Sequence, residues 1–247
     1  MKILVQNLQK KPSLATTLAG EHDPHVMLVQ EINLHSETFP FQATYVSSMG
    51  YGTAISSKGG LRNIRLVESP HAEFGGFIRK KTTVCTVDTN TTSLQFVSFH
   101  GYNGQPFKSI EKLVAHVKAV IAVLSPGPAI FAGDFNSWSE GHLTAVNIVL
   151  EKAGFHLAYS WPYPGRDFSL DHAFLRGVRL KTSSHFESGS DHLGAILEVD
   201  FVDEEGRIAE GGGRIAEGGG NSGIASEYNY SLCLFFLFIF LLLFKKG

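Results

Sequence analysis

The chain has 247 residues, of which 43% are hydrophobic, a length and composition that fit one domain with a substantial core. Its 21 Lys and Arg against 23 Asp and Glu give a formal net charge of −2, which excludes a strongly basic surface as a sign of nucleic-acid binding and leaves room for a local basic patch. Two cysteines exclude a disulfide framework and a cysteine-based zinc site, and this favours a reducing compartment.

The first segments predict a strand, a helix and a second strand. Lys2 to Asn7 is too short an apolar run for a secretory signal peptide and reads as a strand that ends in an amide, which predicts a cytoplasmic protein. Ser13 is expected to cap a brief helix through Leu18, with Gly20 ending it. Val26 to Glu31 is another apolar strand that ends in polar groups.

The middle of the chain predicts short strands followed by a helix. Gln42 to Val46 and Tyr51 to Ser56 read as strands, and Phe77 to Val87 with Ser93 to His100 read as a hairpin. From Ile110 to Leu124, apolar residues recur at helical spacing, which predicts an amphipathic helix.

The second half continues with a buried strand, a helix and two late strands. The strand is Ala129 to Ala132, an apolar run between Pro128 and Gly133. A helix is predicted at 143–153, and strands at 170–175 and 193–201. The predicted elements follow the order strands, helix, strand, helix and strands, with hairpins early in the chain. This order predicts a layered α/β sandwich of the α+β type rather than a parallel βαβ array.

The stretch after Gly133 carries the first chemical signal. Asp134 and Asn136 are one residue apart, and alternate side chains of an extended backbone point the same way, so the carboxylate and the amide are expected to emerge together at the end of a strand. Ligands collect at the carboxyl ends of strands in α/β folds. The competing interpretation is an ordinary turn, because Gly, Asp and Asn also form turns.

Other polar residues also stand where apolar runs end. Carboxylates and amides in such positions suit Mg²⁺, with Mn²⁺ as an alternative, and histidines beside carboxylates supply proton donors and charge stabilisers. Each residue alone is more often a surface hydrogen bond or a solvated strand end, but their recurrence favours a site. These residues are Asn7, Glu31, His100, Asp134, Asn136, Asp171, Asp191 and His192.

In chain order, these residues and their neighbours resemble the motifs of the endonuclease/exonuclease/phosphatase superfamily, which includes DNase I-like nucleases, abasic-site endonucleases, sphingomyelinases and inositol-phosphate phosphatases. The resemblance spans residues 1–201, and Gly-Asp-Phe-Asn at 133–136 with Ser-Asp-His at 190–192 are its most specific parts. It implies a DNase I-like layered sandwich, in which two facing mixed β-sheets are flanked by helices and the site lies at one rim. It also implies Mg²⁺-dependent hydrolysis of a phosphoester.

The same resemblance implies ligands for the metal and for the substrate. Glu31 resembles the principal metal ligand, Asn7 its support, and Asp191 a further carboxylate of the metal site. Asn136 resembles the residue that holds a phosphate oxygen, and Asn103 is expected to touch phosphate as well.

It further implies catalytic roles. Asp134 resembles the residue that orients or deprotonates the attacking water. His192 resembles the imidazole that stabilises the charged transition state, and Asp171 its orienting partner. His100 matches the position of a candidate acid for the leaving oxygen.

Three nearby residues carry less specific signals. Trp138 follows the central motif and could stack a base, although burial in the core is the favoured interpretation. Trp161 and Tyr163 lie in a proline-containing loop that is either a lip of the substrate site or packing on its own domain. His172 is expected to pack, because it points to the opposite face from Asp171.

The chain changes character after residue 201. The segment 202–230 carries the sequence Arg-Ile-Ala-Glu-Gly-Gly-Gly twice and reads as a flexible glycine-rich linker. The segment 231–247 contains thirteen consecutive apolar residues from Leu232 to Phe244. It is a candidate membrane anchor, and the alternatives are a lipid-anchor attachment signal or an incidental extension of the reading frame.

Together these features predict a Mg²⁺-dependent phosphoesterase that cleaves a phosphodiester, with nucleic acid favoured over lipid as its substrate. A sphingomyelinase-like lipid phosphodiesterase is the first alternative, because the body is neutral and the tail hydrophobic. A membrane-tethered binding module without turnover is the second. The sequence carries no signal for the oligomeric state.

Overall fold

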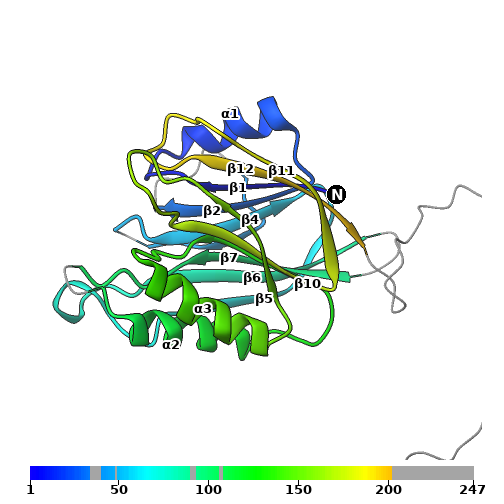
Figure 1. Ribbon diagram of the computed structural model, residues 1–247. Coiled ribbons are helices and arrows are strands. Elements are labelled where there is room, and N and C mark those ends of the chain that lie inside the picture. Colours follow the sequence, from blue (N-terminus) through cyan, green and yellow to red (C-terminus); the bar gives the residue numbers. More distant parts are fainter. Residues whose placement is uncertain (34–39, 48, 90–92, 106–107, 202–247) are drawn as a thin grey trace, which may run out of the picture. The chain divides into compact units, whose positions relative to one another are not determined.

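Two six-stranded sheets face each other in a computed structural model, which describes residues 1–33, 40–47, 49–89, 93–105 and 108–201 (Figure 1). The first sheet has the order β11 (Val178–Phe186), β12 (Gly194–Phe201), β1 (Lys2–Asn7), β2 (Val26–Ile32), β4 (Gly52–Ser57) and β3 (Ala43–Tyr45). The second has the order β5 (Leu61–Glu68), β6 (Lys81–Asp88), β7 (Ser93–His100), β8 (Ala129–Asp134), β10 (Asp171–Arg176) and β9 (His156–Trp161).

Helices cover the outer faces of both sheets, so the domain has four layers. Helix α1 (Ser13–His22) lies on the first sheet, and α2 (Ile110–Ile121) and α3 (Glu140–Lys152) lie on the second, as Figure 1 shows. This arrangement is the DNase I-like layered sandwich predicted from the sequence, with one parallel pair in each sheet, β1 with β2 and β7 with β8.

The largest apolar cluster lies between the sheets, and two smaller clusters lie under the helices. Polar contacts cross the inter-sheet layer, among them two between side chains in its interior. Gln30 donates from Nε2 to Oγ of Ser98 over 3.0 Å, and the hydroxyls of Thr53 and Thr83 are 2.8 Å apart. Because buried polar atoms need partners, these pairs fix how the two sheets are aligned.

The strands predicted from apolar runs are confirmed to within a few residues, but three strands were missed. These are β5, β9 and β11, and each lies at an edge of its sheet. Exposed residues make up most of β5 and β11, so neither shows the apolar alternation that marks a half-buried strand. In β9 the burial rises only toward Trp161.

Two predicted boundaries were wrong. The strand expected from Phe77 begins at Lys81, because a short 3₁₀ turn at Phe74–Gly76 leaves the Phe77 side chain 89% exposed. Helix α1 runs through Gly20 and ends before Asp23, which takes a left-handed conformation. Pro12 precedes the helix and no side chain caps it, so the expected Ser13 cap is absent.

The predicted linker at 202–230 and hydrophobic tail at 231–247 lie outside the described residues. Within the described part of the chain, no helix is long and apolar enough to cross a membrane.

Candidate active site

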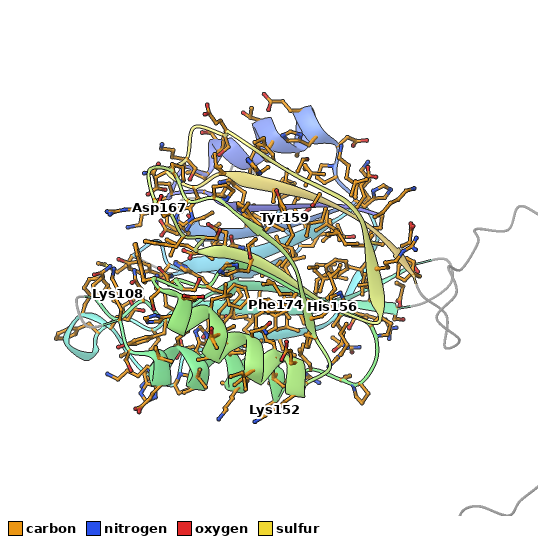
Figure 2. The ribbon with its side chains drawn as sticks, in the orientation of Figure 1. Lys108, Lys152, His156, Tyr159, Asp167 and Phe174 are labelled. Carbon is orange, nitrogen blue, oxygen red and sulfur yellow. The ribbon has the colours of Figure 1, made fainter. Side chains whose placement is uncertain are left out.

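The predicted site residues converge because strand ends meet at one rim of the two sheets. Strands β7 and β8 run parallel, so His100 pairs with Asp134 at their carboxyl ends, and antiparallel β10 begins opposite them with Asp171 paired to Asp134. In the first sheet, Asn7 ends β1 beside Gln30 of parallel β2. In Figure 2, Lys108 and Asp167, from loops at this rim, lie on the left of the view, and His156 at the start of β9 lies to the right.

Gly133 allows the end of β8 to approach its neighbour. Its φ is +139°, and an added Cβ would lie 2.2 Å from the carbonyl oxygen of Phe99. A side chain at this position would therefore clash with the backbone of β7. The glycine of the central motif is thus a requirement of strand packing, and it precedes the carboxylate of Asp134.

The pair Asp134 and Asn136 forms a turn as well as part of the site. Strand β8 ends at Asp134, and Asn136 has a left-handed φ of +53°, so the expected alternation along an extended strand does not apply. Instead, the backbone N–H of Asn136 donates to Oδ1 of Asp134 over 2.9 Å. The turn itself brings the amide beside the carboxylate, where Nδ2 of Asn136 donates to the carbonyl of Gly101 over 3.1 Å.

Asp171 and His192 form a buried hydrogen-bonded pair. Nδ1 of His192 is 2.7 Å from Oδ2 of Asp171, and its Nε2 is 3.9 Å from Oδ2 of Asp134. Burial opposes the charged ring, but three carboxylates, with Asp171 foremost, outweigh it and raise the pKa of His192 to about 10. The ring therefore carries a proton on Nε2 that faces Asp134.

Asn7 contacts the same oxygen of Asp134 that His192 faces. Its Nδ2 donates to Oδ2 of Asp134 over 3.1 Å, and its Oδ1 accepts from the backbone N–H of Gln9 over 3.0 Å. Burial raises the pKa of Asp134, and the charge of Asp171 adds to this effect. A carboxylate in this position has a strong need for a positive partner.

Glu31 is displaced from the ladder of β2. The register between β2 and β4 shifts at this residue, which marks a bulge, and its φ is +57°. Such a conformation costs about 1 to 3 kcal/mol for a residue other than glycine, and bulges are a known means of redirecting a side chain next to a site. Burial raises the pKa of the Glu31 carboxyl, against the opposing charge of Lys80.

His100 is fully buried beside two carboxylates and a lysine. Its Nε2 is 3.8 Å from Oε1 of Glu31, 3.6 Å from Oδ2 of Asp134 and 2.6 Å from Nζ of Lys80. Burial and the charge of Lys80 lower the pKa of His100 well below its usual value, so the ring is neutral. An ammonium can only donate, so a charged Lys80 favours the tautomer in which Nε2 of His100 carries no proton. The acid role implied for His100 stays a prediction.

Asn103 lies beside this group in the loop after β7. Its backbone N–H donates to Oε1 of Glu73 over 2.6 Å, and its Oδ1 accepts from Nε1 of Trp138 over 2.8 Å. No hydrogen bond of the Asn103 amide nitrogen is found within the described part of the chain, and its contact with phosphate stays a prediction. Trp138 is half-buried with Lys108 over its ring, so the favoured prediction of a core tryptophan was wrong.

The residues at this rim suit a divalent metal ion. Two groups of residues each offer three ligand atoms that lie within 4.8 Å of one another. The first group is Glu31, His100 and Asp134, and the second is Asp134, Asp171 and His192. Oδ1 of Asp171 is buried without a hydrogen-bond partner among the described residues. Asp191 belongs to neither group, and its exposed side chain accepts from the Ser190 hydroxyl over 3.3 Å.

Three residues of the site were missed by reasoning from the sequence or left without a role. Lys80 and Glu73 are buried here although both are polar, and neither follows an apolar run that could have marked it. Tyr163 packs edge-on against His192, with ring centroids 4.9 Å apart. This contact places Tyr163 beside His192, and whether the loop forms a lip of the substrate site stays a prediction.

Comparison with known proteins finds a family whose model matches this chain, and relatives that this chain matches over part of their length. A model of the Endonuclease/Exonuclease/phosphatase family matches residues 5–192, more than half of the chain. A UPF0294 protein of Vibrio parahaemolyticus is 34% identical over 111 residues, which cover 42% of this chain and 39% of that protein. The matched segment thus spans about two fifths of the length of this curated relative.

Solved structures share the fold at low sequence identity. An endonuclease/exonuclease/phosphatase family protein from Leptotrichia buccalis is 15% identical with a TM-score of 0.61, covering 81% of this chain and all of that one (100%). Danio rerio (D. rerio) TDP2 complexed with single-strand DNA product is also 15% identical with a TM-score of 0.61, covering 81% of this chain and 98% of that one. At these identities the likeness shows the fold alone.

Proposed function

The chain belongs to the Endonuclease/Exonuclease/phosphatase family, and from that premise we propose that it is a Mg²⁺-dependent phosphoesterase that cleaves a phosphodiester in nucleic acid. The observation that carries the proposal is the buried pair of His192 and Asp171, whose imidazole faces Asp134 with 3.9 Å between Nε2 and Oδ2. A cationic donor next to a hydrogen-bonded carboxylate suits a phosphoryl group under attack by water. The DNA product in the related TDP2 structure favours nucleic acid as the substrate class.

Each side chain has a role that its contacts support. Asp134, fixed by Asn7 and by the backbone of Asn136, orients the attacking water and accepts its proton. His192 donates from Nε2 to a phosphoryl oxygen as negative charge develops there, and Asp171 keeps the ring charged and correctly turned.

The metal ion would be held by Glu31 with Asn7 in support, at the edge of the Asp134 carboxylate. When bound, a divalent ion supplies Lewis acidity and positive charge to the phosphoryl oxygens. Asn136 and the amide nitrogen of Asn103 would bind the remaining oxygens. Mn²⁺ has the same preference for oxygen ligands and is expected to substitute.

The test is hydrolysis by the purified chain and by its Asp134→Ala variant, with Mg²⁺ and with EDTA. The substrates are bis-p-nitrophenyl phosphate, plasmid DNA and RNA oligomers. We expect turnover that EDTA abolishes and that Asp134→Ala reduces by ~10²–10³ or more. Asp88→Ala is the matched control, because this exposed aspartate pairs with Ser93 at the opposite rim. Activity that survives Asp134→Ala would overturn the assignment of the site.

The lipid alternative is favoured by one observation, an apolar edge near the site. Phe77 is 89% exposed, Met49 55% and Phe74 52%, and Phe74 stacks on Tyr51. Salt separates the two substrates, because nucleic-acid binding releases counterions and weakens steeply as salt is added. Hydrolysis that ignores salt and requires sphingomyelin in vesicles would support the lipid enzyme instead.

A further inference from the structure

Lys80 is buried in the site although its position in the sequence gives no sign of it. Its side chain is 2% exposed, with Nζ 2.6 Å from Nε2 of His100 and 4.5 Å from the ring centroid of Tyr51. Lysine is almost never buried to this extent unless a partner compensates its charge. The burial of Lys80 therefore calls for an explanation in the chemistry of the site.

The charge of Lys80 has carboxylates near it but no ion-pair partner among the described residues. Burial lowers the pKa of Lys80 below its usual value, and the charges of Glu73, Asp134 and Glu31 oppose this and favour the ammonium. Its hydrogen bond within the described part of the chain goes to the neutral ring of His100. An ammonium has three N–H donors, so two remain for another acceptor. A phosphoryl oxygen is an acceptor of the right charge.

Lys80 also competes with a metal ion for the same ligand atom. Glu31, His100 and Asp134 could form one cation site, and it shares Asp134 with the second group, Asp134, Asp171 and His192. Two-metal phosphoesterases place their ions about 3.5–4 Å apart and share a ligand in this way. The Nε2 atom of His100 has one lone pair, and the hydrogen bond from Lys80 uses it.

We propose that Lys80 takes the place of a second divalent cation. The site then holds one metal ion, and the ammonium of Lys80 supplies the second positive charge beside His100 to the phosphoryl group. This inference rests on the proposed phosphoesterase function. It accounts for the burial of Lys80, for its unused donors and for the neutral His100 that accepts from it.

The test counts metal ions independently of catalysis. The full chain is freed of metal and titrated with Mn²⁺, and electron paramagnetic resonance measures the Mn²⁺ that stays free. We expect one bound ion in the unaltered chain and in Lys80→Arg, and a second, weaker ion in Lys80→Met, where the lone pair of His100 is released. Lys81→Met is the matched control, because Lys81 pairs with Glu68 outside the site, and it should bind one ion.

Phosphodiester hydrolysis gives a second readout on the same variants. At a Mg²⁺ concentration that fills only the first site, Lys80→Met should lose ~10²–10³ in rate, as for other preorganised charges, and more Mg²⁺ should restore part of it. Lys80→Arg should keep more activity than Lys80→Met. If Lys80→Met does not fold, as judged by circular dichroism, His100→Asn serves in its place and should still bind one ion, since His100 is not a ligand.

The outcomes separate this inference from the function it rests on. Two ions of similar affinity in the unaltered chain, or one ion and an unchanged rate in Lys80→Met, would overturn the role of Lys80 and leave the phosphoesterase standing. Loss of the ion in His100→Asn would also overturn it. An unaltered chain that binds no ion and hydrolyses no substrate would overturn the proposed function itself.

Discussion

His192 keeps a proton that burial alone would remove. Its charge depends on the short contact from Nδ1 to Asp171, which lies at the start of β10 and is 1% exposed. Tyr163 packs against the same ring and restricts its access to water. The chemistry of the site thus depends on one buried carboxylate that need not touch the substrate.

Asp171→Asn should therefore reduce kcat by ~10²–10³ while changing KM little, because the neutral amide no longer stabilises the charged ring. The variant should also lower the pKa of His192 from about 10, which an NMR titration of the imidazole measures directly. Asp200→Asn is the control, since this aspartate contacts Arg179 over 3.6 Å on the edge of the first sheet. An unchanged pKa would show that other carboxylates hold the charge.

Gly133→Ala tests the close approach of β8 to β7. The added methyl group would meet the Phe99 carbonyl at 2.2 Å in a backbone conformation that L-residues rarely adopt. We expect a loss of about 2 kcal/mol or more in the free energy of unfolding, measured in urea. Gly165 has a φ of +73°, and nothing lies within 4 Å of a Cβ added there. Gly165→Ala should therefore lower the free energy of unfolding by about half as much as Gly133→Ala.

Single residues of the site differ in how far they could be predicted. Asn7, Asp134 and Asp171 stand at the ends of buried apolar runs, and a strand end is visible in a sequence because burial leaves a hydrophobic pattern. Lys80 follows an exposed loop, and its burial results from tertiary contacts with His100 and Tyr51 that no local pattern records.

At the scale of elements, the strands that escaped prediction are those at the edges of the sheets. An edge strand such as β5 or β11 buries little of either face, so its sequence need not alternate. The clear helix α2 was predicted because it packs one apolar stripe on the second sheet. Helix α1 was predicted too short because a glycine was taken as its end.

Gly20→Ala follows from that correction. Gly20 lies inside α1 with nothing within 4 Å of an added Cβ, so alanine should stabilise the protein by about 0.5–1 kcal/mol through the smaller entropy it loses on folding. A urea titration measures the change. Destabilisation would mean that the helix ends at Gly20, as first predicted.

At the scale of the whole molecule, two buried histidines outside the catalytic set should limit stability in acid. Burial lowers the pKa of both His116 and His172 to about 3. The ring of His172 has hydroxyl partners on both nitrogens, Ser137 at 2.6 Å and Ser160 at 2.7 Å, as expected of a packing residue. Both rings are therefore neutral in the folded protein.

In the unfolded chain these histidines bind protons below about pH 6.5, whereas in the folded chain they bind them only below about pH 3. The free energy of unfolding should therefore fall as the pH drops through this window, and these histidines should not affect it at higher pH. Each ring should account for about 2 kcal/mol by pH 5. His172→Asn should reduce the pH dependence of the urea midpoint, and exposed His156→Asn should not. An equal slope in the two variants would contradict this origin.

The place of β1 in the first sheet has a consequence for the order in which a ribosome delivers the chain. Strand β1 pairs with β2 on one side and with β12 on the other, and Lys2 lies opposite Glu198. In a nascent chain, the edge of β1 that pairs with β12 therefore stays unpaired until β12 has been synthesised. His192 lies in the loop just before β12, so it is also synthesised late. Contacts this distant in sequence slow folding and leave apolar strands exposed to chaperones or to other nascent chains. The proposed hydrolysis would therefore require translation of the domain to be nearly complete.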